Sequence, residues 1–508
     1  MRYGFVIDQD RCIGCHACTV ACKEEHQMPI GVFRTWVKYV EKGEFPHTTR
    51  HFGVMRCNHC DSAPCTTICP THALFRRSDG IIDFDNNRCI GCKGCMQACP
   101  YDALYIDPNT NTAAKCNFCA HRVENKLEPA CVIVCPTQAI LAGDLDNPGS
   151  KVSRAIATQK VSVRKPQKGT DPKLFYVGIE GDLLHPTRLS HQSSYAFAEQ
   201  HDNRHIDERR DPGFDPSVTR EVYDVAHPVP WGWKIAAYLW TKSIASGVLM
   251  VATLLAGSVG PGFWLRVISP TIALVALILT GALLIFDLKR PDRFFYLLTK
   301  PNFRSWLVLG ALILMAYGAL AAAWLLGIFD MSEHHPLFSW PTMLTLFLSA
   351  ASAGYSAFLF AQAKGRDLWQ SPMFLWHLLL HALIAGSAIL IIVGWFLGEF
   401  FLTEGAMVVL MLSMMVSLLM VLVEVALPHV SEDSTRAVAM LVRGRLRARF
   451  WGIVIGAGLV LPIVISISVL PSHSDKNFSM VLVALLALLG VWCFEDLWVK
   501  AGQAVPLS

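Results

Sequence analysis

Charged side chains are scarce in this chain of 508 residues, because Asp, Glu, Lys and Arg together make up only 17% of it. The deficit lies almost entirely after Trp231, which excludes a water-soluble domain for the second half of the chain. Cysteine is also nearly absent from that half, since sixteen of the seventeen cysteines precede Pro136. Such an uneven distribution excludes one uniform domain, and the two halves are therefore interpreted separately.

The sequence also lacks several signals of other functions. The first residues, MRYGFVIDQDRCIGC, contain no basic stretch, apolar core or small-residue cleavage site, so we expect neither a Sec nor a twin-arginine signal there. The cysteine-rich part contains no Ser/His/Asp arrangement, phosphate-binding glycine loop or paired substrate carboxylates, which indicates that bond chemistry takes place on another polypeptide. The net charge of +4 gives no indication of nucleic-acid binding.

The cysteines that are present form four groups of four. Two groups share the spacing Cys-x2-Cys-x2-Cys-x3-Cys, and the residues around them repeat as well, Arg11–Cys15 against Arg88–Cys92. Several thiolates within one or two turns suit iron–sulfur clusters better than long disulfide loops. The groups are Cys12, Cys15, Cys18 and Cys22; Cys57, Cys60, Cys65 and Cys69; Cys89, Cys92, Cys95 and Cys99; and Cys116, Cys119, Cys131 and Cys135.

The spacing also predicts how the groups share their clusters. In two-cluster ferredoxins the first three cysteines of a group bind one cluster and the fourth binds the neighbouring cluster. We apply this rule to the outer two groups and to the inner two groups, which gives four 4Fe-4S clusters. The predicted ligand sets are Cys12, Cys15, Cys18 and Cys135; Cys22, Cys116, Cys119 and Cys131; Cys57, Cys60, Cys65 and Cys99; and Cys69, Cys89, Cys92 and Cys95. Zinc sites are the alternative, and His59, His72 and His121 are interpreted as surface or supporting groups.

Residues 1–182 resemble the four-cluster electron-transfer subunit of the molybdopterin oxidoreductase superfamily, as in dimethyl sulfoxide, polysulfide and thiosulfate reductases. The resemblance rests on the cysteine groups and on the segments Cys57–Cys60, Lys115–Cys119 and Glu128–Cys131. It implies an α+β, ferredoxin-like iron–sulfur domain, which we assign to residues 1–184. It also implies a separate catalytic subunit that contains molybdopterin or tungstopterin.

A polar stretch, residues 185–230, is predicted to be a linker. Tyr195, Phe197 and Tyr223 could anchor it to the first domain, and a flexible tether is the alternative. Residues 231–508 contain eight apolar runs long enough to cross a bilayer, so we expect an all-α, multi-pass membrane domain. The runs lie near residues 235–256, 267–286, 306–328, 341–363, 373–397, 406–427, 451–470 and 479–498.

The distribution of positive charge predicts the orientation of the membrane domain. The loops after the second and sixth helices are rich in basic residues, whereas the opposite loops offer little beyond Arg266 and Lys476. The positive-inside rule therefore predicts a domain in the inner membrane whose iron–sulfur part faces the cytoplasm. The alternative is that these residues serve docking or a family motif. They are Lys289, Arg290, Arg293, Lys300, Arg304, Arg436, Arg443, Arg445, Arg447 and Arg449.

Residues Phe286–Trp306 closely resemble the stretch that joins the second and third helices of the NrfD-like family, the membrane subunits of the polysulfide reductase type. Trp231–Trp233 with Tyr238 resembles the first helix of that family, and Gly354–Tyr355 resembles the fourth. The resemblance implies binding of a quinone, either menaquinone or ubiquinone, without haem and close to the nearest cluster.

Polar side chains within the apolar runs are the functional candidates of the membrane domain, because such groups are costly in lipid. Residues expected to contact quinone are Trp231, Trp233, Lys234, Tyr238, Asp287, Arg290 and Tyr355. Residues expected to transfer protons are His377, His381 and Glu424. Bonding between helices is the alternative role for each residue. The two histidines lie one turn apart on one helix, so they cannot ligate opposite sides of a haem, and we expect no haem.

These features together predict an iron–sulfur and quinone-interacting membrane subunit of a respiratory oxidoreductase complex. It would transfer electrons one at a time between the separate catalytic subunit and the quinone pool. The alternative is a proton-translocating membrane module that receives electrons from a soluble dehydrogenase. Ionisable groups through both halves of the membrane would favour this alternative, whereas the polar groups here gather near one face.

Overall fold

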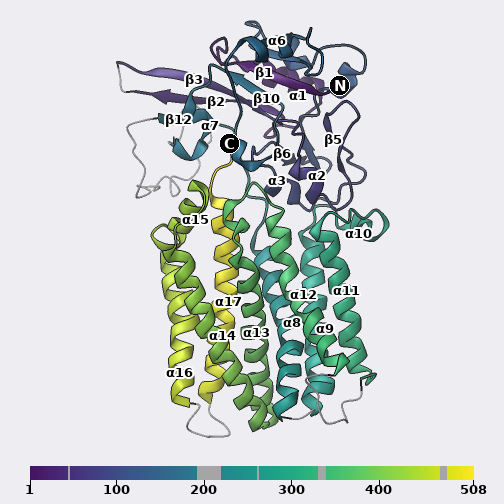
Figure 1. The fold of residues 1–508 in the computed structure, drawn as a ribbon, viewed down its shortest axis with the longest axis vertical. Helices are drawn as coiled ribbons and strands as arrows, with labels where there is room; N and C mark the ends of the chain where they lie inside the picture. The colour runs from purple at the N-terminus through teal and green to yellow at the C-terminus, as the bar shows by residue number, and fades with distance from the viewer. Residues whose placement is uncertain (44–45, 192–218, 260–261, 330–338, 470–477) are drawn as a thin grey trace.

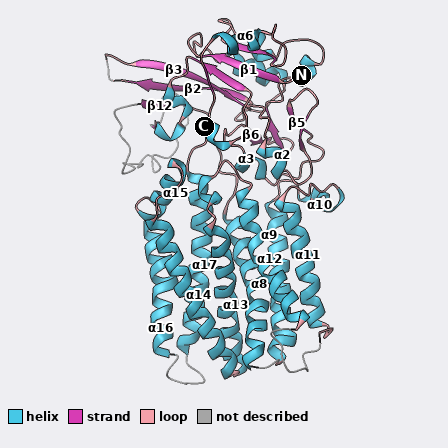
Figure 2. Ribbon diagram, in the orientation of Figure 1, coloured by secondary structure: helices cyan, strands magenta, loops and turns pink. Residues whose placement is uncertain are grey.

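The computed structural model of the protein describes residues 1–43, 46–191, 219–259, 262–329, 339–469 and 478–508. An α+β domain lies at one end of a bundle of long helices (Figures 1 and 2), which confirms the predicted fold class. The end of the chain returns from the bundle to the α+β domain (Figure 1). There, Lys38 Nζ donates to the carbonyl of Ser508 at 2.9 Å, and Arg164 Nη2 donates to the carbonyl of Leu507 at 3.0 Å.

A four-stranded mixed sheet pairs the first strand of the α+β domain with strands from the end of its sequence. Its strand order is β8-β1-β10-β9, with β8 at Ile140–Asp144, β1 at Tyr3–Asp8, β10 at Leu174–Val177 and β9 at Val161–Ser162. Strand β1 pairs in parallel with β10, Phe5 opposite Leu174, and antiparallel with β8, Ile7 opposite Ile140. These four residues are buried, as a continuous apolar run in a central strand requires.

A second sheet includes part of the predicted linker. Its order is β11-β12-β2-β3, with β11 at Ser190–His191, β12 at Thr219–Tyr223, β2 at Thr35–Lys42 and β3 at Thr49–Arg56. Tyr223 pairs with Tyr39 in the register, and the two ring centroids are 5.5 Å apart. The other expected anchors, Tyr195 and Phe197, lie outside the described residues.

Short helices and hairpins surround the cysteine groups. The helices are α1 (Ala17–Glu25), α2 (Pro64–Ile68), α3 (Gly94–Ala98), α4 (Ala120–Val123), α5 (Ala130–Ile133), α6 (Lys151–Thr158) and α7 (Gly181–Leu184). The hairpins are β4 (Leu74–Arg76) with β5 (Ile82–Phe84), and β6 (Leu104–Ile106) with β7 (Ala113–Lys115). Strand β5 lies directly before the third cysteine group in sequence.

The membrane domain contains eight helices that are long and apolar enough to cross a bilayer, within the residues described, as the apolar runs predict. The spanning helices are α8 (Trp233–Val259), α9 (Ser269–Asp287), α11 (Trp306–Leu325), α12 (Trp340–Ala361), α13 (Met373–Leu397), α14 (Phe400–Ala426), α16 (Leu461–Val469) and α17 (Phe478–Ala504). The π-helical segments Trp264–Ile268 and Arg449–Val460 extend α9 and α16 at their N-terminal ends. Two short helices on the side of the α+β domain, α10 (Tyr296–Thr299) and α15 (Glu432–Val442), complete the bundle.

Close packing at glycines holds the centre of the bundle together. Helices α8 and α13 cross at Gly247 and Gly386, where a Cβ atom added to Gly247 would lie 1.8 Å from the carbonyl oxygen of Ala382. A Cβ atom added to Gly310 would lie 2.2 Å from the ring of Tyr355. Since no side chain fits at either position, these contacts fix the helices beside the polar residues of α8, α12 and α13.

Candidate functional site

The four predicted ligand sets each come together in the α+β domain. Three sets line separate small cavities: Cys12, Cys15, Cys18 and Cys135; Cys57, Cys60, Cys65 and Cys99; and Cys69, Cys89, Cys92 and Cys95. In the remaining set, the thiol of Cys22 interacts with those of Cys116, Cys131 and Cys119. The grouping is the one expected from the two-cluster ferredoxin rule, in which the fourth cysteine of each group joins the partner group.

The chemistry of these thiols suits a multi-iron cluster. Burial raises the pKa of the Cys18 thiol to about 11 and that of the Cys92 thiol to about 12. Such thiols become thiolate ligands only when metal cations replace their protons. Among the residues that the structure describes, no three Cys, His, Asp or Glu side chains converge on a point where one ion could be held. Four thiols around one cavity are the ligand set that a 4Fe-4S cluster takes.

The repeated motif gives the same backbone at two sets. Gly14 and Gly91 both have φ of +69°, and the residues before the following helices, His16 and Lys93, have φ of 58° and 62°. A Cβ atom at Gly91 would lie 2.6 Å from Lys289 Cβ of the membrane domain, so glycine permits this close approach. Backbone N–H groups point at cysteine sulfurs, for example Ala139 N to Cys135 Sγ at 3.2 Å, and such bonds tune cluster potentials.

The sets follow one another in a line. Cys18 of the first set interacts with Cys131 of the second, and Cys116 of the second interacts with Cys57 of the third. Cys95 of the last set interacts with Cys65 of the third. The first set includes Cys15, which is exposed at the protein surface. The line therefore runs from the surface of the α+β domain through its core.

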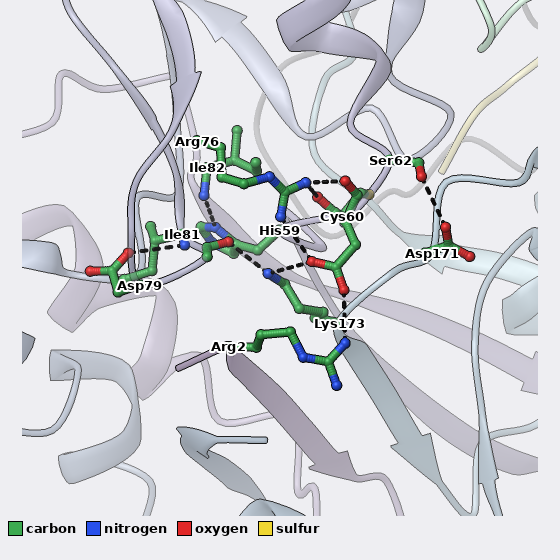
Figure 3. A network of polar contacts seen from close by, with 12 residues as sticks. Arg2, His59, Cys60, Ser62, Arg76, Asp79, Ile81, Ile82, Asp171 and Lys173 are labelled. Carbon is green, nitrogen blue, oxygen red and sulfur yellow. Dashed lines mark hydrogen bonds and ion pairs between the residues drawn. The ribbon is translucent and has the colours of Figure 1, made fainter. Parts of the chain in front are cut away.

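A polar network supports the third set (Figure 3). His59 lies between Cys57 and Cys60 in sequence, and its Nδ1 accepts the backbone N–H of Ile82 at 3.2 Å. Burial, together with nearby lysines, lowers the pKa of His59 well below its usual value, so the ring is neutral. Arg76 Nη2 donates to the carbonyl of Cys60 at 2.9 Å. His59 thus bonds to the backbone beside the third set, while His121 Nε2 lies 2.6 Å from Glu25 Oε1 at the surface.

The last set touches the membrane domain directly. Asn302 Nδ2 donates to the carbonyl of Cys69 at 2.7 Å, and Arg293 Nη1 donates to that of Cys89 at 3.1 Å. Trp231 Nε1 donates to the carbonyl of Cys92 at 3.3 Å. Three of the four cysteines in this set therefore have backbone carbonyls bonded by side chains of the membrane domain.

Charged and amide groups extend this contact between the domains. Lys93 Nζ lies 2.7 Å from Asp287 Oδ2, with side-chain exposures of 8% and 13%. Gln97 Nε2 donates to Gln503 Oε1 at 2.5 Å, and Arg366 Nε donates to Gln97 Oε1 at 2.8 Å. The domains are thus held by buried polar bonds, which require a fixed relative position.

The structure separates the seven residues expected at quinone into two places. Tyr238 lies beside Tyr355 in the bundle, and both are buried. The others lie where the two domains meet. Trp231 is buried, and its ring stacks on Trp369 at 5.3 Å, whereas Trp233 is 59% exposed.

Three charged members of that list have partners within the protein. Lys234 Nζ donates to the carbonyl of Phe286 at 2.9 Å, at the end of α9. Arg290 pairs with Asp292 at 2.9 Å, while Asp287 pairs with Lys93. Asp287 and Arg290 are thus each paired with a different charge at the end of α9.

The expected proton-transfer residues lie in one polar chain of contacts. Glu424 accepts from Ser371 Oγ at 2.6 Å and lies 2.9 Å from His377 Nε2. The rings of His377 and His381 are 6.2 Å apart, and His381 Nδ1 lies 3.2 Å from Glu495 Oε1. Ser371 precedes α13 on the side of the α+β domain, so the chain of contacts leads from that side into the bundle.

Two buried charged residues of this region, Glu495 and Lys242, are not among the site residues predicted from the sequence. Glu495 is 1% exposed on α17, and its Oε2 has no bonding partner. Lys242 is fully buried on α8, where its Nζ donates to Ser356 Oγ at 2.7 Å and lies 4.8 Å from the centre of the Tyr355 ring. A charged residue inside an apolar run is the signal that could have identified both.

Comparison with known proteins agrees with this arrangement. Residues 221–506 match the family model described as polysulphide reductase, NrfD. The protein belongs to the NrfD family. In front of the NrfD domain, residues 49–145 match a 4Fe-4S dicluster domain and residues 3–24 match a 4Fe-4S binding domain.

Relatives of the first part of this NrfD protein are subunits of reductases. A subunit of the tetrathionate reductase of Salmonella typhimurium is 44% identical over 189 residues, which cover 36% of this chain and 76% of that subunit. A subunit of the polysulfide reductase of Wolinella succinogenes is 42% identical over 181 residues, 35% of this chain and 94% of that one. The arsenate respiratory reductase iron–sulfur subunit of a Shewanella species is 35% identical over 225 residues, 35% and 96% of the two chains. The NrfD protein is therefore an iron–sulfur, electron-transfer component of an oxidoreductase, fused to a multi-pass membrane domain.

Proposed function

We propose that the protein carries electrons through four 4Fe-4S clusters between quinone and a separate catalytic subunit that contains molybdopterin or tungstopterin. The observation that carries the proposal is the line of four cysteine sets from exposed Cys15 to the carbonyls of Cys69, Cys89 and Cys92 that contact the membrane domain. A bound cluster supplies the one-electron chemistry, and the protein supplies the spacing and the environment.

The proposed partner binds over the first set. Ile13 lies between two of its cysteines and is 58% exposed, Val20 on α1 is 63% exposed, and Ile133 on α5 is 55% exposed. Helix α1, which carries Cys18 of this set, packs against α5, which carries Cys131 of the second set. Apolar side chains gathered at the exposed end of an electron path favour a protein contact there.

The proposed quinone site lies between the last set and the polar residues of α8 and α12. Lys242 and Tyr238 supply a cation and a hydroxyl that can donate to a quinone carbonyl, and Tyr355 forms the wall beside them. Trp231, seven residues before Tyr238 in sequence, donates its indole N–H to the carbonyl of Cys92 at 3.3 Å. The arrangement suits menaquinone and ubiquinone equally, because both have a pair of ring carbonyls.

Quinone takes up two protons with two electrons, and the polar chain of contacts provides a route for them. Glu424 is the group nearest the α+β side, and His377, His381 and Glu495 continue inward. Glu424 with His377, and His381 with Glu495, are within hydrogen-bond distance, so each pair can exchange a proton. Among the described residues of the spanning helices, the buried groups Lys242, His377, His381, Glu495 and Asp496 all lie toward the α+β side, which favours proton uptake from that side over translocation across the whole membrane.

The proposed location is the inner membrane with the α+β domain in the cytoplasm. Part of the positive charge used for this orientation has another role: Arg293 donates to the carbonyl of Asn86 at 2.6 Å, and Arg436 donates to that of Thr187. The positive charges of the exposed residues Arg443, Arg445 and Arg447 still support this orientation. Protease added to intact spheroplasts should therefore leave the α+β domain uncut. Cleavage within this domain would show that it faces the periplasm and would refute the proposed orientation.

Purification in mild detergent with iron analysis and reduced-state EPR tests the proposed function. We expect about sixteen irons per chain, from four clusters of four, and reduction of the clusters by added quinol or their reoxidation by quinone. Glu399→Gln, at the end of the bundle away from the α+β domain, is the control for variants of Glu424, His377, His381 or Glu495. It should leave electron exchange with quinone unchanged. Four or eight irons would refute the ligand sets, and full clusters that exchange electrons with no quinone or quinol would refute the quinone site.

A further inference from the structure

A fully buried arginine lies among the cysteines of three sets. Arg56 is the last residue of β3 and directly precedes Cys57 of the third set. It is 1% exposed, and its Nη1 lies 3.1 Å from Cys131 Sγ of the second set. Its charge also interacts with Cys18 of the first set and with Cys116 of the second. The guanidinium of Arg56 therefore lies beside thiols of the first and second sets, and the backbone of Arg56 continues directly into Cys57 of the third set.

The bonding capacity of this guanidinium is largely unused by the protein. Nε and Nη2 of Arg56 have no partner, although both atoms are buried. One face of the group lies 4.6 Å from the centre of the Phe5 ring, which covers it on that side. A buried cation without an acid partner is unfavourable unless negative charge is placed beside it. Iron–sulfur clusters with four thiolate ligands supply that charge and also provide sulfur acceptors for the free N–H groups.

We propose that Arg56 is a fixed positive charge that raises the reduction potentials of the two clusters held by the Cys18 and Cys131 sets. This inference rests on the proposed four-cluster function. An electron added to either cluster increases its negative charge, so a cation nearby favours the reduced form. Arg56 forms and breaks no covalent bond in this step and keeps its proton, because a guanidinium stays charged in proteins. Arg56 is thus a positioning and tuning residue, and it makes no contact with a substrate.

Potentiometric EPR titration of the purified full chain measures this effect. In Arg56→Gln we expect the equilibrium constant for reducing at least one cluster to fall tenfold or more, which corresponds to about 59 mV for a one-electron couple. Arg56→Lys keeps the charge, so the same constant should change by less than about threefold. Arg164, which is equally buried but bonded to the carbonyl of Leu507, provides the control Arg164→Gln, in which those two clusters should keep their potentials.

Iron content separates this inference from the proposed function. Sixteen irons in the parent protein establish the clusters independently of any potential. Unchanged potentials in a fully loaded Arg56→Gln protein would overturn the inference. If Arg56→Gln loses iron, Arg56→Met replaces it, because a methionine leaves no unpaired polar group in the core. Loss of iron in both uncharged variants, with retention in Arg56→Lys, would overturn a tuning role in favour of a role in cluster assembly.

Discussion

The Lys93–Asp287 ion pair links the last cysteine set to the membrane domain, and its removal should loosen that contact. Asp287→Asn leaves the ammonium of Lys93 with 8% exposure and no opposite charge. Breaking a buried pair by removing one partner costs about 3–5 kcal/mol, and the partial exposure of Asp287 lowers our expectation to about 2–4 kcal/mol. Replacement of both partners, in Lys93→Met/Asp287→Leu, should recover most of this loss, because no unpaired charge remains.

The rate at which iron–sulfur absorbance bleaches on heating in detergent measures this effect, because unfolding of such a protein is irreversible. A loss of about 3 kcal/mol that appears entirely in the rate would accelerate bleaching about 100-fold. Lys234→Met, which removes a cation bonded to a carbonyl at the same membrane face, should change the rate much less. Equal losses in the single and double variants, or no loss in Asp287→Asn, would refute the reasoning.

Three further changes have definite expected outcomes. Gly247→Ala places a methyl group 1.8 Å from the carbonyl oxygen of Ala382 and should destabilise the bundle by at least about 3 kcal/mol. Gly281→Ala is the control, because nothing lies within 4 Å of the added methyl group. The yield and the thermal stability of the two variants in detergent should differ accordingly. Glu495→Gln should lower quinone-linked turnover at least tenfold while dithionite still reduces all clusters, and equal turnover would remove Glu495 from the proton route. Burial lowers the pKa of His227, but bonds to Asp102 and Asp224 outweigh it and raise the pKa to about 10. The stabilisation is therefore complete below about pH 6.5 and is lost as the pH rises toward 10, and His227→Gln should flatten this pH dependence of bleaching.

The elements that follow from local chemistry are the ones that the sequence predicts well. Each spanning helix must satisfy its own backbone in lipid, so a long apolar run is sufficient evidence for it. The four cysteine sets follow from spacing, because clusters impose a regular pattern on their ligands. The repeat Arg11–Cys15 and Arg88–Cys92 even has matching backbone angles at Gly14 and Gly91.

Partners that depend on distant segments are not predictable in this way. Asp287 and Arg290 are three residues apart, yet each pairs with a different charge because the α+β domain brings Lys93 to Asp287. Glu495 is more than one hundred residues from His381 in sequence, and only the packing of α13 against α17 brings them together. Strand β12 also forms from a polar stretch without clear periodicity, because β2 offers it an edge to pair with.

The hydrogen bonds from Asn302, Arg293 and Trp231 tie the position of the last cysteine set to the membrane domain. These bonds cover the carbonyls of Cys69, Cys89 and Cys92, and Gly91 lies against Lys289. A shift of either domain would break these bonds, so the last set and the membrane domain form one structural unit.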